Sequence, residues 1–167
     1  AGLTPHRPLI VEALARMDEQ ARNAGMMILP GGGFDVVPSD CLSLYLSRQL
    51  PNATKLELNI ISIGSGVSRG TARSGIENMH RQGRIRRDGK IVSVPNVWGI
   101  KEVDFGRGAT RLVSMGWGDV STAYHSTGIP NVTVYMGFPN AMVSMMRLTR
   151  FAGPILYTRA ARDFIKW

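Results

Sequence analysis

Three consecutive glycines stand between a short apolar run and an apolar segment of helical pattern, in the stretch LPGGGFDVVPSDCLSLYL that covers residues 29–46. Glycine permits sharp backbone turns and leaves room for a ligand to approach the main chain. The stretch lacks the Gly-Lys-Ser/Thr ending of a nucleoside-triphosphate loop. Residues 31–33 therefore either bend the chain after a strand or admit a ligand at the strand end, where ligands of open α/β sheets bind.

Two carboxylates, Asp35 and Asp40, follow the glycines on either side of a proline. Paired carboxylates can perform acid–base chemistry. Asp40 also fits the first turn of a helix, where the helix dipole favours an acid, and either Ser39 or Asp40 can cap that helix. We favour the helix role for Asp40, while both roles remain open for Asp35.

A second glycine-containing stretch, GSGVSRG at residues 64–70, follows a predicted strand and precedes a predicted helix. A dinucleotide fingerprint requires glycine at the position of Arg69. The start of the following helix, with Ser68, Arg69 and Thr71, is a reasonable anion site whatever the ligand is.

The chain is strongly basic, with a net charge of +8, which favours an anionic partner such as nucleic acid, an acidic lipid surface or a phosphorylated cofactor. The basic segment HRQGRIRRDGK at residues 80–90 is expected to form a solvated hairpin. It has no interleaved aromatic residues for base stacking, so nucleic-acid binding is not favoured. The roles that remain for this segment are a plain solvated surface, contact with a cofactor phosphate and contact with a partner subunit.

Cysteine and histidine usage gives no metal site. Cys41 is the single cysteine, which excludes an internal disulfide and favours a reducing, cytoplasmic compartment. His6, His80 and His125 lack the spacing of metal ligands. No uninterrupted apolar run is long enough for a spanning helix, and the N-terminus has no signal-peptide pattern.

Hydrophobic periodicity predicts the elements that position these residues. Residues 8–24 read as a helix that Gly25 ends, and residues 26–29 read as a strand buried on both faces. A second helix is expected over residues 39–50, a half-buried strand over 55–63 and a helix over 70–82. An Asp-Gly turn at residues 87–90 predicts a hairpin.

Short β-like segments separated by glycines follow from residue 101 to residue 138, and Tyr124 is read as a strand residue. The tail from residue 141 to residue 167 has a helical pattern rich in methionine and arginine, interrupted at Gly153 and Pro154. We favour a tail that packs at a dimer interface, at an interface between domains or in the core. The alternative is that it lies on an acidic membrane surface. The expected class is α+β, a mostly antiparallel sheet with flanking helices, preceded by the last helix and strand of an α/β domain.

The segment GFDVVPSD at residues 33–40 resembles the Gly-Phe-Asp-Ser-Val/Ile-Pro-Ser-Asp signature of the saccharopine dehydrogenase-like oxidoreductases, a group that includes trans-acting enoyl reductases. SRGTARSGIENM, at residues 68–79, is similar to the Gly-Thr-x-x-Ser segment of that family. GDVSTAYHSTGIPNVTVYMGFP, at residues 118–139, resembles a later part of its second domain.

The resemblance implies a dinucleotide-binding domain that holds NADP or NAD, followed by an α+β domain that shapes the substrate site and often dimerises. It assigns residues 1–37 to a C-terminal remnant of the first domain and residues 38–167 to the second, which makes the chain a fragment that is expected to be inactive alone. The intact enzyme would transfer a hydride to a C=N or C=C bond of a small molecule, and the chain would form a homodimer.

On this resemblance the candidate site residues fall into three groups. Proton transfer is assigned to Asp35, Tyr124 and His125, and the cofactor is expected near Gly32, Gly33 and Phe34. Contacts to the substrate, or to an anionic group of substrate or cofactor, are expected from Ser39, Asp40, Arg69, Thr71 and Ser74. The alternative is a basic, non-catalytic module that binds nucleic acid or an acidic membrane surface, and such binding would weaken steeply with salt.

Overall fold

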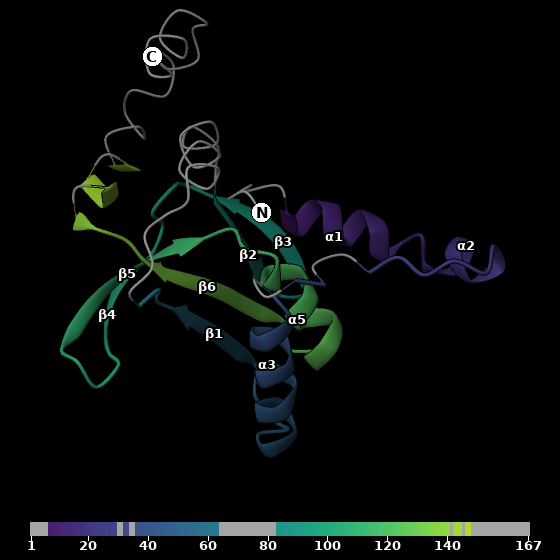
Figure 1. The fold of residues 1–167 in the computed structure, drawn as a ribbon, viewed down its shortest axis with the longest axis horizontal. Helices are drawn as coiled ribbons and strands as arrows, with labels where there is room; N and C mark the ends of the chain where they lie inside the picture. The colour runs from purple at the N-terminus through teal and green to yellow at the C-terminus, as the bar shows by residue number, and fades with distance from the viewer. Residues whose placement is uncertain are drawn as a thin grey trace, which may run out of the picture.

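A six-stranded sheet with helices against it forms the body of the chain (Figure 1). The computed structural model describes residues 7–29, 32–33, 36–63, 83–140, 142–144 and 146–147. Five strands follow the order β3-β2-β6-β5-β4 with antiparallel pairing, and β1 pairs with β6 in parallel. The strands are β1 (Lys55–Ile60), β2 (Gly83–Arg87), β3 (Lys90–Val94), β4 (Ile100–Asp104), β5 (Ala109–Met115) and β6 (Asn131–Gly137). The predicted α+β class with a mostly antiparallel sheet is confirmed.

The turn between β2 and β3 confirms the predicted hairpin. Asp88 and Gly89 both adopt left-handed backbone conformations, with φ of 48° and 74°. Two such residues in succession give the turn whose twist matches that of paired strands. Between β4 and β5, the Asp104 carboxylate accepts hydrogen bonds from the backbone N–H groups of Gly106, Arg107 and Gly108.

The core lies between the sheet and helix α5 (Asp119–Thr127). Val120 of α5 packs with Trp117 and with Val134 of β6, and Leu58 and Ile60 of β1 lie against this cluster. The parallel pairing of β1 with β6 places Leu58 opposite Val134 and thereby widens the apolar surface that α5 covers. Among the described residues, no helix is long and apolar enough to cross a membrane.

Helix α5 corrects the prediction of a strand at Tyr124. Its sequence is rich in serine and threonine, which are weak helix formers, so the pattern alone does not indicate a helix. The sheet buries Val120 and Ala123, and Gly128 ends the helix in the left-handed conformation with φ of 74°. Burial of one helix face therefore outweighs the low intrinsic propensity of the segment.

The N-terminal region also differs from its prediction. Residues 8–24 form two short helices, α1 (Arg7–Ala15) and α2 (Asp18–Asn23), which extend to one side of the sheet (Figure 1). Gly25 ends α2 as predicted, with φ of 65°, and the Met26 N–H donates to the Ala21 carbonyl.

Residues 26–29, by contrast, form no strand, and the predicted burial on both faces is wrong. The side chain of Met27 is 89% exposed. A strand buried on both faces needs neighbouring strands and covering layers, and none of the strands in the described ranges pairs with this segment.

Two other predicted elements form close to their expected bounds. The helix expected over residues 39–50 is α3 (Val37–Gln49), with Pro38 in its first turn, and the strand expected over 55–63 is β1. The helix expected over residues 70–82 and residues 148–167 of the tail lie outside the described part of the chain.

One buried cation, Arg86 of β2, joins α1, α5 and the β2–β3 turn. Its guanidinium donates to the carbonyls of Val120, at 2.9 Å, and Gly89, at 2.7 Å, and forms an ion pair with Glu12 of α1. The ring of Tyr124 stacks on the guanidinium at 4.1 Å. Arg86 is only 3% exposed, so the expected solvated basic hairpin is wrong for this residue, because its charge is used to hold helices in place.

Replacing Arg86 with methionine is expected to lower the free energy of unfolding by about 3 kcal/mol, because it leaves Glu12 and two carbonyls without their shared donor. Arg87→Met is the matched control, since Arg87 is the next residue on the same strand and is exposed. It should change stability by less than about 0.5 kcal/mol. Urea unfolding of the two variants measures both values, and equal losses would contradict the role assigned to Arg86.

Candidate functional site

Helix α3 turns its small polar side chains toward α5 and its large apolar side chains outward. Ser43 is buried and donates to the Ser39 carbonyl at 2.7 Å, and Ser47 donates to the Leu44 carbonyl at 2.8 Å. Hydroxyls that bond to the backbone of their own helix need no partner on the neighbouring helix. The two helices therefore approach through small side chains, while the exposed face carries Leu42, Tyr45, Leu46 and, just beyond the helix, Leu50.

A buried carboxylate, Asp119 at the start of α5, faces the first turn of α3. The Ser39 hydroxyl lies 2.5 Å from Asp119 Oδ1 and 2.9 Å from the Val36 carbonyl oxygen. Burial raises the pKa of Asp119 to about 6; hydrogen bonds from Ser39 and from the backbone N–H of Asp119 act against this rise, and the charge of Asp40 adds to it. A protonated Asp119 can donate to Ser39, which frees the Ser39 hydroxyl to donate to Val36.

Asp40 lies one residue further along α3 and forms a second carboxylate contact with α5. Its Oδ2 atom accepts a hydrogen bond of 2.6 Å from the Ser126 hydroxyl. Its Oδ1 atom and the hydroxyl oxygen of Thr122 are buried and have no hydrogen-bond partner among the described residues. The sequence had predicted that Ser39 or Asp40 caps α3, but neither side chain does so. The helix begins at Val37, so both residues belong to its first turn and their side chains reach α5.

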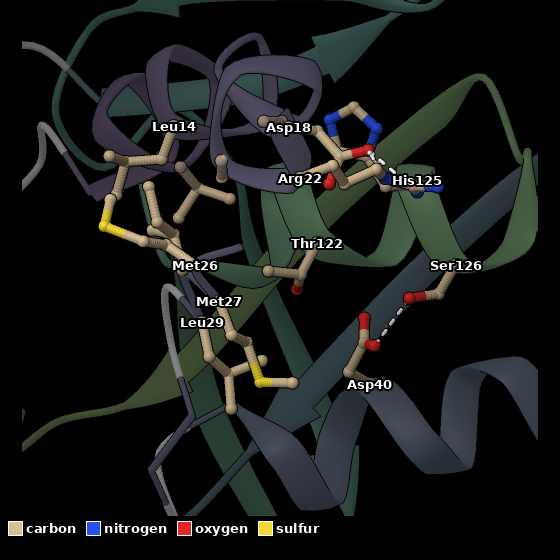
Figure 2. Close-up of a pocket in the computed structure, with 14 residues that line it drawn as sticks. Leu14, Asp18, Arg22, Met26, Met27, Leu29, Asp40, Thr122, His125 and Ser126 are labelled. Carbon is tan, nitrogen blue, oxygen red and sulfur yellow. Dashed lines mark hydrogen bonds and ion pairs between the residues drawn. The ribbon is translucent and has the colours of Figure 1, made fainter. Parts of the chain in front are cut away.

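These contacts form one wall of a cavity of about 800 Å³ (Figure 2). The polar wall consists of Asp40, Thr122, His125 and Ser126. The opposite wall comes from α1, α2 and residues 26–29, and Asp18 and Arg22 add an exposed ion pair there. Most of its remaining side chains are apolar: Val11, Leu14, Ala15, Ala21, Met26, Met27, Ile28 and Leu29. A cavity of this size and composition is typical of small-molecule sites.

Glu12 fixes α1, and with it one side of the cavity, to α5. Its Oε1 atom accepts from the Ser121 hydroxyl at 2.7 Å, lies 3.2 Å from His125 Nε2 and pairs with Arg86. Burial alone would raise the pKa of Glu12, but the Ser121 hydrogen bond, the charge and hydrogen bond of Arg86 and the charge of His125 hold it below its usual value. Glu12 therefore stays ionised and holds the ring of His125 at the cavity.

The two residues predicted for proton transfer on α5 have different surroundings. His125 lines the cavity, and its side chain is 45% exposed. Tyr124 instead packs its ring on the Arg86 guanidinium, with its hydroxyl next to Gly89. Because Tyr124 is not among the residues that line the cavity, its expected role in proton transfer has no support from the geometry.

The two glycines predicted to contact a cofactor, Gly32 and Gly33, are both described. A Cβ atom added to Gly33 would meet nothing within 4 Å, so a ligand has room beside this residue. A Cβ atom on Gly32 would lie 2.9 Å from the end of the exposed Leu29 side chain, which can turn away. Asp35, Phe34, Arg69, Thr71 and Ser74 lie outside the described residues. No group of three metal-ligating side chains occurs in the described ranges.

A second polar cluster lies on the sheet, away from this cavity. Lys101 donates to Glu57 at 2.7 Å and lies 4.3 Å from the centre of the Tyr135 ring. Burial and the charge of Glu57 raise the pKa of Tyr135. A phenol with a raised pKa is a poorer acid at neutral pH, so this cluster is less suited to proton transfer than the cavity wall.

Several residues of the site carry no signal in the sequence. The sequence reads as a strand in the segment that holds Asp119, Thr122 and Ser126. Their spacing places them on one face only because the segment is a helix. Glu12 and Arg86 are typical surface residues by type, and only the fold brings them together. The signal that could have found α5 is the pair of glycines, Gly118 and Gly128, at its two ends.

No protein-family model matches this chain, and no curated protein sequence matches it at a significant level.

The raised pKa of Asp119 predicts how stability depends on pH. Between pH 3.8 and about 6 the folded chain keeps a proton that the unfolded chain has lost, so stability falls as pH rises through this range. The total loss is at most about 3 kcal/mol. Asp119→Asn should remove this slope and be the more stable protein at pH 7.

Urea unfolding at a series of pH values from about 4 to 7 measures this slope. Glu12→Gln is the control, because Glu12 has a lowered pKa and contributes stability that is lost only as pH falls below its usual value of 4.5. That variant should keep the Asp119 slope. An unchanged slope in Asp119→Asn would show that another group causes it.

The close approach of α3 and α5 depends on Gly118. A Cβ atom there would lie 2.9 Å from Val36 Cγ2, although the backbone angles, φ −56° and ψ −37°, suit any residue. Gly118→Ala is therefore expected to cost about 1–2 kcal/mol through crowding alone. In a double-mutant cycle with Val36→Ala, the same substitution should cost much less. Additive effects in the cycle would contradict this contact.

Proposed function

We propose that this chain forms the substrate-binding and dimerisation part of an NAD(P)-dependent oxidoreductase of the saccharopine dehydrogenase-like kind. The observation that carries the proposal is the cavity between residues 26–29 and α5. The segment with the family-like signature, residues 33–40, connects its two walls: residues 26–29 precede the glycines, and Asp40 ends the signature. A site at this connection fits a domain that shapes a substrate cleft.

The walls of the cavity suit the binding and protonation of a small organic substrate. Apolar side chains of α1, α2 and residues 26–29 offer contact surface for an apolar part of the substrate, and Asp40 and Thr122 offer oxygen acceptors that orient a polar group. His125 has its ring held by Glu12 and can give or take a proton at the open side of the cavity. The nicotinamide cofactor, when bound, supplies the hydride for a C=N or C=C bond.

The outer face of α3 supports the dimerisation part of the proposal. Leu42, Tyr45, Leu46 and Leu50 are all exposed, and their spacing places them along one side of the helix. An exposed apolar stripe of this kind marks an interaction surface. The cytoplasm, where Cys41 stays reduced, is the compartment that this proposal implies.

The alternative function, a basic non-catalytic module that binds nucleic acid or an acidic membrane surface, loses part of its support. Arg86 is buried in an ion pair, and the side chain of Arg84 donates to Ser93 across the hairpin. Both arginines belong to the segment that was expected to form a solvated basic patch. Arg86 is the one whose charge is paired and buried, so it is lost to phosphate contacts. We therefore do not propose nucleic-acid or membrane binding as the primary function.

The test is NADPH binding and oxidation by the protein expressed from its complete gene, with a cyclic imine and an α,β-unsaturated thioester as hydride acceptors. We expect oxidation with one of them, and NADPH affinity that changes by less than about tenfold between about 50 and 200 mM salt. His125→Gln should lower kcat by at least about a hundredfold if this ring moves the proton.

Asp88→Asn, in the β2–β3 turn, is the matched control and should leave kcat unchanged, since Asp88 is not among the residues that line the cavity. Absence of NADPH binding, or RNA binding that collapses with salt, would overturn the proposal.

A further inference from the structure

Two buried oxygen atoms at the polar wall of the cavity have no partner among the described residues. They are Oδ1 of Asp40 and Oγ1 of Thr122, and both side chains line the cavity. Figure 2 shows the free oxygen of Asp40 and the Thr122 hydroxyl on the same side of the cavity, between α3 and α5. A buried acceptor without a donor costs free energy. Both atoms are closed to solvent in this conformation, so a ligand gains affinity here when the side chains turn to expose them to its donors.

The charges around this point favour a cation. Asp40 accepts one hydrogen bond, from neutral Ser126, and its carboxylate forms no ion pair within the described part of the chain. Asp119 on α5 adds a second carboxylate close enough for the two charges to repel. The basic side chains that line the cavity contact other carboxylates, Arg22 that of Asp18 and His125 that of Glu12. Although the whole chain is basic, this wall is therefore acidic.

The rest of the cavity favours an apolar chain attached to that cation. The side chains of Leu14, Ala21, Met26, Met27 and Leu29 form the opposite wall. Methionine and leucine offer apolar surface that adapts to a flexible chain. A bare metal ion would leave this wall unused, and no group of three metal-ligating side chains lies within the described residues.

We propose that the cavity binds an amphiphilic primary amine, whose ammonium group donates to Asp40 Oδ1 and Thr122 Oγ1 and whose apolar chain lies against residues 26–29. A primary ammonium carries three N–H donors and no acceptor, which matches a wall of free acceptors. This inference deepens the proposed function by naming the substrate class, and it rests on that function for the reaction. Binding itself needs no cofactor and can be tested on this chain alone.

The test is calorimetric titration of the 167-residue chain at neutral pH with n-octylammonium, octan-1-ol and octanoate. These three probes share one alkyl chain and differ in the head group. We expect octylammonium to bind at least about tenfold more tightly than octanol, because its hydrogen bonds to a carboxylate are charge-assisted. Octanoate should bind most weakly. From butylammonium to octylammonium, affinity should rise about two- to fourfold per methylene group.

Three variants locate the head group. Asp40→Asn should abolish the preference for octylammonium over octanol and leave octanol binding unchanged, which also shows that the cavity is still formed. Thr122→Val should lower the preference severalfold, and it serves as the second variant if Asp40→Asn does not fold. Asp88→Asn is the matched control, because Asp88 is an exposed aspartate in the β2–β3 turn that does not line the cavity. It should alter affinity by less than about twofold.

Three outcomes would overturn the inference: equal binding of octanoate and octylammonium, an unchanged preference in Asp40→Asn, or displacement of octylammonium by equimolar potassium or magnesium. Failure of the proposed function is a separate result. NADPH oxidation with an acceptor that carries no amine, together with no octylammonium binding, would refute this inference and leave the oxidoreductase proposal standing. Octylammonium binding without NADPH oxidation would refute the oxidoreductase proposal and leave the amine site standing.

Discussion

The arrangement of the helices depends on the buried guanidinium of Arg86. A planar cation with five N–H donors can serve several acceptors at once, and here those acceptors belong to α1, α5 and the β2–β3 turn. Tyr124 covers the face of the cation, which explains why this phenol lies away from the cavity. Because Arg86 holds Glu12 and Glu12 holds His125, the position of α1 and the orientation of a cavity residue follow from one buried charge.

The contact between α3 and α5 has the opposite electrostatic character. Small side chains and Gly118 bring the helices close enough that two carboxylates, Asp40 and Asp119, share a confined space without a cation. An ionised Asp119 costs stability at neutral pH, since its burial and the charge of Asp40 both oppose its ionisation. Sites with this cost are found where a protein binds or transforms a ligand. The free oxygen of Asp40 lies at the cavity and not at the outer surface, which agrees with a role in binding.

Two groups of exposed apolar side chains lie beside the cavity and on α3. Residues 26–29 contribute side chains to the cavity wall and remain largely exposed, and the leucines of α3 face away from the body. Exposed apolar surface is unfavourable in water. Covering either region, with more polypeptide or with a second copy of the chain, would therefore stabilise the protein. The basic residues of the hairpin contribute less to the surface than their number in the sequence indicates, because Arg86 is inside.

The sequence by itself determined the α+β class, the helix after Pro38, the strand at 55–60 and the Asp-Gly hairpin, because periodicity, proline and turn residues act over a few neighbouring positions. It also pointed to Ser39, Asp40 and His125, which the fold brings to one cavity or its edge. Tertiary structure alone decided that residues 119–127 are helical, that residues 26–29 remain unpaired among the described strands, and that Arg86 is buried. These outcomes depend on burial against the sheet and on charges paired over 74 and 113 positions, Arg86 with Glu12 and His125 with Glu12, and no local pattern encodes such distances.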